Sequence, residues 1–260
     1  MTPPHPERTL SRRGFVTSLT AGALVTGAIG VTGCTDGGAG RAAAPSPETT
    51  PGAQRASPVR ETRRVIPGLG PRTMRSIGDD ARQVFVVTAA DGDANRATAL
   101  LYERHPTRGW QRTAGPWSAR NGYRGWTDDH RMGDLRTPIG VYRLTDAGGL
   151  LPDPGTELPY DQGRHFTPPD RLSHEGRSLR GAFDHVVAIN YNRVAGRSPY
   201  DFTRPEGTAK GGGIWIHVDH SSATSGCIGI SRPRMAELLR RLDPGDRPVI
   251  AMGPVASLAR

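Results

Sequence analysis

The chain has 260 residues, of which 35% are hydrophobic and 6% aromatic, and it carries a formal net charge of +9 at pH 7. This length is sufficient for one domain with a sizeable hydrophobic core. The positive charge would suit an anionic partner, but the sequence has no zinc-finger, recognition-helix or RNA-binding pattern. We therefore expect no nucleic-acid partner.

The first 33 residues have the layout of an export signal. A basic, polar stretch that contains Arg12 and Arg13 is followed by an apolar and small-residue run over residues 16–33. The paired arginines resemble the twin-arginine class of signal, and the glycines and threonines of the run argue against a permanent transmembrane helix. We expect residues 1–33 to direct export as a lipoprotein signal peptide.

The signal region ends in the tetrad VTGC, which resembles a bacterial lipobox. The resemblance implies that Cys34 carries a lipid and becomes the first residue of the mature protein.

Residues 34–66 are rich in Ala, Pro, Ser, Thr, Gly and Arg, which predicts a disordered linker. We expect the protein to be held by its lipid at the outer face of the cytoplasmic membrane, where an anionic cell wall suits its charge. Two alternatives are that Cys34 is an ordinary signal residue or that it forms a disulfide with Cys227.

The predicted folded domain spans residues 67–256 and consists mainly of β-strands. Short runs rich in Val, Ile, Tyr or Trp are bounded by Gly, Pro, Asp or Asn, as is typical of strands. The expected strands are residues 83–89, 98–104, 110–115, 139–144, 185–192, 213–218, 227–231 and 247–252.

One helix is expected late in the chain. Ser231 can cap it, and Met235, Leu238 and Leu239 fall on one face before Pro244 ends it. Residues 150–180 are rich in Pro, Gly and His with little periodicity, which predicts a long ordered loop or a lid over the sheet. The fold class expected is therefore mainly β with few helices.

Cys227, in the stretch ATSGCIGIS, is the candidate nucleophile. A thiol reacts as its thiolate, and a free cysteine with a pKa near ~8.5 is mostly protonated at neutral pH, so it needs a base. His217 is the expected base, because it lies on the predicted strand 213–218 and the turn that follows can return Cys227 beside it. The amides of Gly226 and Cys227 are expected to stabilise an oxyanion, since glycine lets the main chain approach a substrate closely.

The stretches IWIHV and TSGCIGIS, together with the helix that follows, resemble the catalytic end of the YkuD-type L,D-transpeptidases. The hallmark of that family is a histidine followed by a Ser/Thr-x-Gly-Cys strand. Upstream, RTPIGVYRL over residues 136–144 resembles the family's Thr-Pro-x-Gly-x-(Phe/Tyr) strand. The resemblance covers roughly residues 80–253 and implies a β-sandwich or mixed-sheet domain.

The resemblance also implies roles for individual residues. Cys227 is the nucleophile and His217 the general base, while Thr224, Ser225 and Gly226 form the oxyanion and substrate-binding turn. Members of the family form a thioester with peptidoglycan stem peptides, release a terminal D-alanine and pass the acyl group to an amine. Peptidoglycan stem peptides are thus the expected partner, and no cofactor or metal is implied.

Two positions depart from the family pattern. Ser225 stands where a second histidine is usual, and Gly229 stands where Arg or Asn is frequent. A clamp for a substrate carboxylate must then come from elsewhere, with Arg193 and Arg232 as candidates. Five other histidines are expected to be structural or loop residues: His130, His165 and His174 in polar loops, His185 at a strand start and His220 in a turn.

Two other classes of protein fit the sequence. His217, Asp219, His220 and Cys227 could hold zinc in a cell-wall peptidase, since all three residue types are zinc ligands, although a His-Glu-x-x-His helix is absent from the sequence. The chain could also be a non-catalytic wall-binding lipoprotein, a possibility suggested by Ser225 and Gly229.

Overall fold

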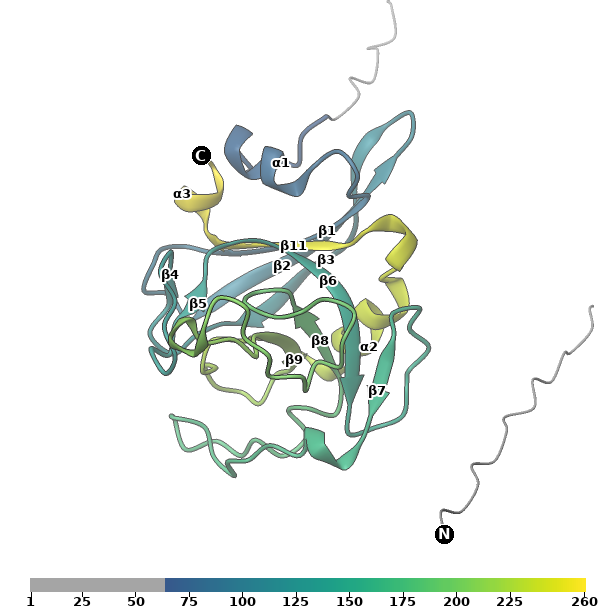
Figure 1. The fold of residues 1–260 in the computed structure, drawn as a ribbon. Coiled ribbons are helices and arrows are strands. Elements are labelled where there is room, and N and C mark those ends of the chain that lie inside the picture. The colour runs from purple at the N-terminus through teal and green to yellow at the C-terminus, as the bar shows by residue number, and fades with distance from the viewer. Residues whose placement is uncertain (1–63) are drawn as a thin grey trace, which may run out of the picture. The chain divides into compact units, whose positions relative to one another are not determined.

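The computed structural model describes residues 64–260, which fold into a mainly β domain with few helices (Figure 1). Its strands are β1 (Gln83–Ala89), β2 (Arg96–His105), β3 (Gly109–Arg120), β4 (Trp126–Thr127), β5 (Thr137–Pro138), β6 (Gly140–Gly149), β7 (Tyr160–Gln162), β8 (Val186–Ile189), β9 (Trp215–Val218), β10 (Ile228–Ile230) and β11 (Val249–Pro254). Its α-helices are α1 (Pro71–Ile77), α2 (Arg232–Arg241) and α3 (Val255–Leu258), and single 3-10 turns occur at Arg164–Phe166, Thr208–Lys210 and Pro244–Asp246. The expected signal peptide, Cys34 and nearly all of the expected linker lie outside the described residues.

Nine of the strands form one mixed sheet that closes on itself. Their order is β11-β1-β2-β3-β10-β9-β8-β6-β7, and β11 also pairs with the first half of β6. The pairs β1–β11, β9–β10 and β6–β7 are parallel, and the other pairs in this sheet are antiparallel. This arrangement confirms the mainly β, mixed-sheet fold expected from the sequence.

Strands β8, β9, β10 and β11 bury both of their faces, so their side chains alternate between a central core and an outer layer. In β9, Ile216 and Val218 face the central core, while Trp215 faces outward. Helix α2 closes one side of the central core with Met235, Leu238 and Leu239, all of which are fully buried. Ser231 occupies the N-cap position of α2 as expected, but its side chain makes no capping hydrogen bond.

Two outer faces of the sheet are covered in different ways. The helix-covered face consists of outward side chains of β1, β2, β3 and β11, against which α1 and α3 pack; its members include Val84, Val86, Tyr102, Trp110 and Ala251, with Ile77 and Leu258 from the helices. Figure 1 shows α1 and α3 together beside β1 and β11, and the Gly70 amide donates to Leu258 O at 2.8 Å. The loop-covered face consists of outward side chains of β8, β9 and the start of β10, packed against Phe166 and Phe183 from loops; its members are Val186, Ala188, Trp215 and Cys227.

Each of the eight segments expected to be strands contains or overlaps an observed strand. The expected late helix is α2, whereas α1 and α3 were not predicted; both are short and depend on contacts with distant parts of the chain. The segment 150–180 is not irregular throughout, since it contains β7, a 3-10 turn and a bridge between Leu172 and Ser178. Within residues 64–260, every helix is too short or too polar to cross a membrane.

Candidate functional site

Cys227 immediately precedes β10 and lies on the loop-covered face. It has no disulfide partner within residues 64–260, and the residue as a whole is partly exposed. Its sulfur accepts a hydrogen bond from the Trp215 amide at 3.4 Å and donates to Gly213 O at 3.6 Å. The main chain that leads into β9 therefore holds the sulfur on two sides.

His217 lies on β9 and is 2% exposed. Its Nδ1 is 2.9 Å from Val218 O, and because a carbonyl oxygen can only accept, Nδ1 carries the ring proton. Nε2 then has the free lone pair that a base requires. The ring stacks on His220 at 5.5 Å with an interplanar angle of 12°, and Phe183 packs edge-on against it at 5.5 Å.

The register of the sheet brings His217 and Cys227 onto the same face of neighbouring strands. Ile216 pairs with Ile228 and His217 pairs with Gly229 in the parallel pair β9–β10. Since paired residues of parallel strands point to the same side, Cys227 is a diagonal neighbour of His217, roughly 8 Å away between main chains. Within the part of the chain that the structure describes, the thiol bonds to the main chain and not to the imidazole.

Burial disfavours the charged forms of both groups, and it therefore shifts their pKa values in opposite directions. It raises the pKa of the Cys227 thiol to about 11, although the Trp215 amide acts in the other direction. It lowers the pKa of His217 to about 4, although the hydrogen bond to Val218 O acts in the other direction. Near pH 7 the pair therefore consists of a neutral thiol and a neutral imidazole.

Thr224 fixes the turn in front of Cys227. Its hydroxyl donates to Cys227 O at 2.6 Å and accepts from the Gly226 amide at 3.1 Å. Gly226 has φ +142°, and a Cβ there would lie 3.0 Å from Arg136 O, so this position requires glycine. The Gly226 amide is engaged by Thr224, and it could face an oxyanion only after that bond breaks.

A small hairpin from the segment 150–180 contacts this turn through three consecutive residues. Ser173 Oγ accepts from Ser222 Oγ at 2.9 Å, Nε2 of His174 lies 3.2 Å from Ser225 Oγ, and Glu175 accepts from the Ala223 amide at 3.0 Å. These contacts agree with the expectation that the segment covers the sheet. No local pattern points to His174, because Ser225, the residue that it contacts, is 51 positions away.

The chain matches the model of a known protein family. The model of the YkuD L,D-transpeptidase catalytic domain matches residues 90–250, which include β2 to β10 and α2. The chain belongs to the YkuD L,D-transpeptidase family. Searches of the curated proteins and of the solved structures found no match.

The two arginines expected to clamp a substrate carboxylate in this YkuD domain are both paired with acids of the domain itself. Arg193 is buried with Asp146, at 2.7 Å between Nη1 and Oδ2. Arg232 bonds to Asp184 through Nη1. Arg193 was therefore a wrong candidate, because its charge is buried and paired with Asp146. Arg232 could bind a substrate carboxylate only after its bond to Asp184 breaks.

One of two further buried histidines of the YkuD domain differs from the sequence-based expectation. His130 was expected in a polar loop, but it is 5% exposed, packs edge-on against Tyr191 and has Nδ1 at 3.0 Å from Asp134 Oδ1. His185 is structural as expected, since its Nδ1 lies 2.9 Å from the hydroxyl of Tyr160. Burial lowers the pKa of both imidazoles.

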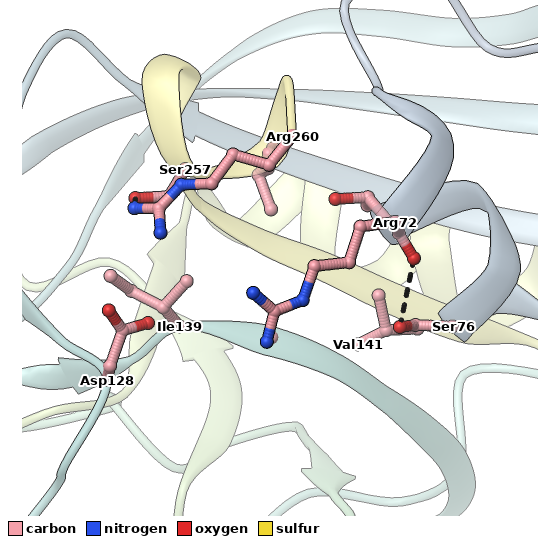
Figure 2. Close-up of a pocket in the computed structure, with 10 residues that line it drawn as sticks. Arg72, Ser76, Asp128, Ile139, Val141, Ser257 and Arg260 are labelled. Atoms are coloured by element: carbon pink, nitrogen blue, oxygen red, sulfur yellow. Dashed lines mark hydrogen bonds between the residues drawn. The ribbon is translucent and has the colours of Figure 1, made fainter.

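A cavity of about 460 Å³ lies away from Cys227, where α1 and α3 approach the start of β6. Figure 2 shows Arg72, Arg260 and Asp128 around it. None of the residues expected to be catalytic lines this cavity.

Within residues 64–260, no group of three or more His, Cys, Asp and Glu side chains is arranged as a metal site. The geometry therefore gives no support to the zinc-peptidase alternative.

Proposed function

We propose that this chain is a cysteine-dependent L,D-transpeptidase that acts on peptidoglycan stem peptides through a thioester acyl-enzyme. The observation that carries the proposal is the placement of a partly exposed Cys227 on the same face as His217, whose Nδ1 is fixed on Val218 O. Covalent acyl transfer uses a nucleophile and an oriented base that come within hydrogen-bond reach, and neighbouring positions on adjacent strands allow these two side chains to approach each other.

The proposed reaction has two acyl-transfer steps. The Cys227 sulfur attacks the carbonyl of the donor peptide while its proton passes to Nε2 of His217. The tetrahedral intermediate collapses to a thioester, and the leaving amine takes the proton from His217. An acceptor amine then attacks the thioester and gives its proton to His217, which returns it to the departing sulfur.

The neutral resting pair has a consequence for this mechanism. Because burial raises the pKa of the thiol and lowers that of the imidazole, the ion pair is disfavoured before substrate binds. Proton transfer must then accompany attack on the carbonyl, when the charge moves from sulfur to the oxyanion. The amide of Cys227, and that of Gly226 once released by Thr224, are the donors proposed for that oxyanion.

We further propose that residues 1–33 export the protein and that lipid on Cys34 anchors it outside the cytoplasmic membrane. This location would place Cys227 beside the cell wall, which contains the proposed donor and acceptor peptides. Incorporation of a labelled fatty acid into the wild type, and its loss in Cys34→Ala, tests the anchor without reference to catalysis.

The catalytic proposal is tested by intact mass spectrometry of the full chain after exposure to a carbapenem, with peptide mapping to locate the adduct. We expect one covalent adduct on Cys227 in the wild type and none at that position in Cys227→Ala. A folded wild type that forms no adduct, yet still binds cell-wall sacculi as Cys227→Ala does, would instead identify a non-catalytic wall-binding protein.

A further inference from the structure

Arg204 lies in the loop between β8 and β9, and its positive charge has no acidic partner within residues 64–260. Asp201, three positions earlier, is bound by Arg197 at 3.1 Å. The Arg204 guanidinium lies over the ring of Phe202 at 5.2 Å and makes one long hydrogen bond to Thr203 O, at 3.4 Å. A guanidinium has five donors, so most of its hydrogen-bonding capacity is unused.

The side chain of Arg204 is held against a run of three glycines that leads into β9. A Cβ on Gly212 would lie 2.4 Å from Nε of Arg204, and one on Gly213 would lie 3.3 Å from Nη2. Gly211, Gly212 and Gly213 all have positive φ, from +68° to +138°. The positive φ values favour glycine at all three positions, and the missing Cβ atoms of Gly212 and Gly213 leave the space that the guanidinium occupies.

The same glycine run contacts the candidate nucleophile. Gly213 O accepts from the Cys227 sulfur at 3.6 Å. With standard bond lengths, the guanidinium of Arg204 and the sulfur are no more than about 11 Å apart. An extended peptide covers this distance in about three residues, and a side chain of the reacting residue covers much of it.

The surface beside Arg204 is apolar and exposed. Phe202 is 51% exposed and Tyr200 42% exposed, and their rings are 4.8 Å apart. A ligand group held by Arg204 would therefore rest against aromatic faces that exclude water and strengthen an ion pair. A planar carboxylate suits such a site, because guanidinium binds it through two parallel hydrogen bonds.

The other two candidate arginines, Arg193 and Arg232, are bound to Asp146 and Asp184. We propose that Arg204 is the residue that binds a carboxylate of the acyl donor and so selects acidic donors over neutral ones. This inference rests on the proposed function and adds to it a specificity-determining residue.

The test compares two tetrapeptide donors that differ only in a side-chain carboxylate on the third residue, free in one and amidated in the other. The readout is the rate of acyl-enzyme formation on Cys227 by mass spectrometry. We expect the wild type to prefer the free carboxylate by about tenfold to a hundredfold, and Arg204→Gln to lose this preference by slowing only the acidic donor. Arg177→Gln is the matched control, since it removes one exposed charge from the covering hairpin.

A second measurement needs no turnover and compares alkylation of Cys227 by iodoacetate and by iodoacetamide, which differ in one carboxylate. Both reagents leave the sulfur alkylated and release iodide. We expect Arg204→Gln to lower the ratio of the two rates several-fold and Arg177→Gln to leave it unchanged.

The two measurements separate the inference from the proposed function. An acyl-enzyme whose donor preference and alkylation ratio are the same in the wild type and Arg204→Gln would overturn the role of Arg204 and leave the transpeptidase proposal standing. If neither donor nor carbapenem acylates the wild type, the proposed function fails, and an unchanged alkylation ratio would remove the carboxylate site as well.

Discussion

The helix-covered face and the loop-covered face are built on the same sheet but have opposite properties. On the helix-covered face, Val84, Val86 and Ala251 are sealed under Ile77 of α1 and Leu258 of α3. All of these side chains are apolar and at most 3% exposed. These five side chains contribute burial of apolar area and have no group with acid–base or nucleophilic chemistry.

On the loop-covered face, the same alternation of strand residues presents Trp215, His217 and Cys227. Loops cover them through a few aromatic contacts and hydrogen bonds, and Cys227 keeps access to solvent. The difference shows that the strands determine which residues reach an outer face, while the covering element decides whether they can meet a substrate. The matched family range, 90–250, contains the loop-covered face and excludes α1, β1 and α3.

We expect the largest effect on function from replacing His217, on the loop-covered face, with Asn. The Asn amide can still donate to Val218 O, but it has no base in place of Nε2. We expect the rate of acyl-enzyme formation to fall by about 10²–10⁴-fold with little change in stability. His220→Asn is the control in the stacked neighbour, and an equal loss there would point to a general disturbance of the face.

On the opposite face, Ile77→Ala should affect stability alone. Ile77 is 2% exposed, and truncation of such a side chain costs about 2–5 kcal/mol of unfolding free energy. Urea denaturation measures the loss, and the acylation rate of the folded variant should equal that of the wild type. A folded Ile77→Ala protein with impaired acylation would show that the two faces are coupled.

A smaller effect is expected on the pH dependence of stability, because His217 is buried on the loop-covered face. Burial lowers the pKa of His217 to about 4, and it also lowers the pKa of His130, His185 and His220. Between pH 6.5 and 4 the unfolded chain binds protons that the folded chain does not, so stability should fall as the pH falls through this window. Urea midpoints measured across it should decline less steeply in His217→Asn, and identical slopes would show that His217 is not held neutral.

The sequence was informative where a feature is local. Alternation of apolar residues predicted the strands, and the stretches around His217 and Cys227 predicted that these two residues would share a face. Helix α1 was missed because Gly70, Arg72 and Thr73 donate to carbonyls of residues 258 and 260, which no local pattern reveals. Arg193 was wrongly expected to be free for a substrate for the same reason, since its partner Asp146 is 47 residues away.

The sequence by itself determined the family, the mainly β character and the candidate pair of nucleophile and base. These follow from residue spacing, which a strand converts directly into a face and a register. The tertiary structure alone decided that the Gly226 amide is held by Thr224, that a distant hairpin reaches the turn before Cys227, and that Arg204 has no acidic partner within residues 64–260. Such features depend on which loops meet after the sheet has closed, and burial and pairing of charges exist only once those loops are in place.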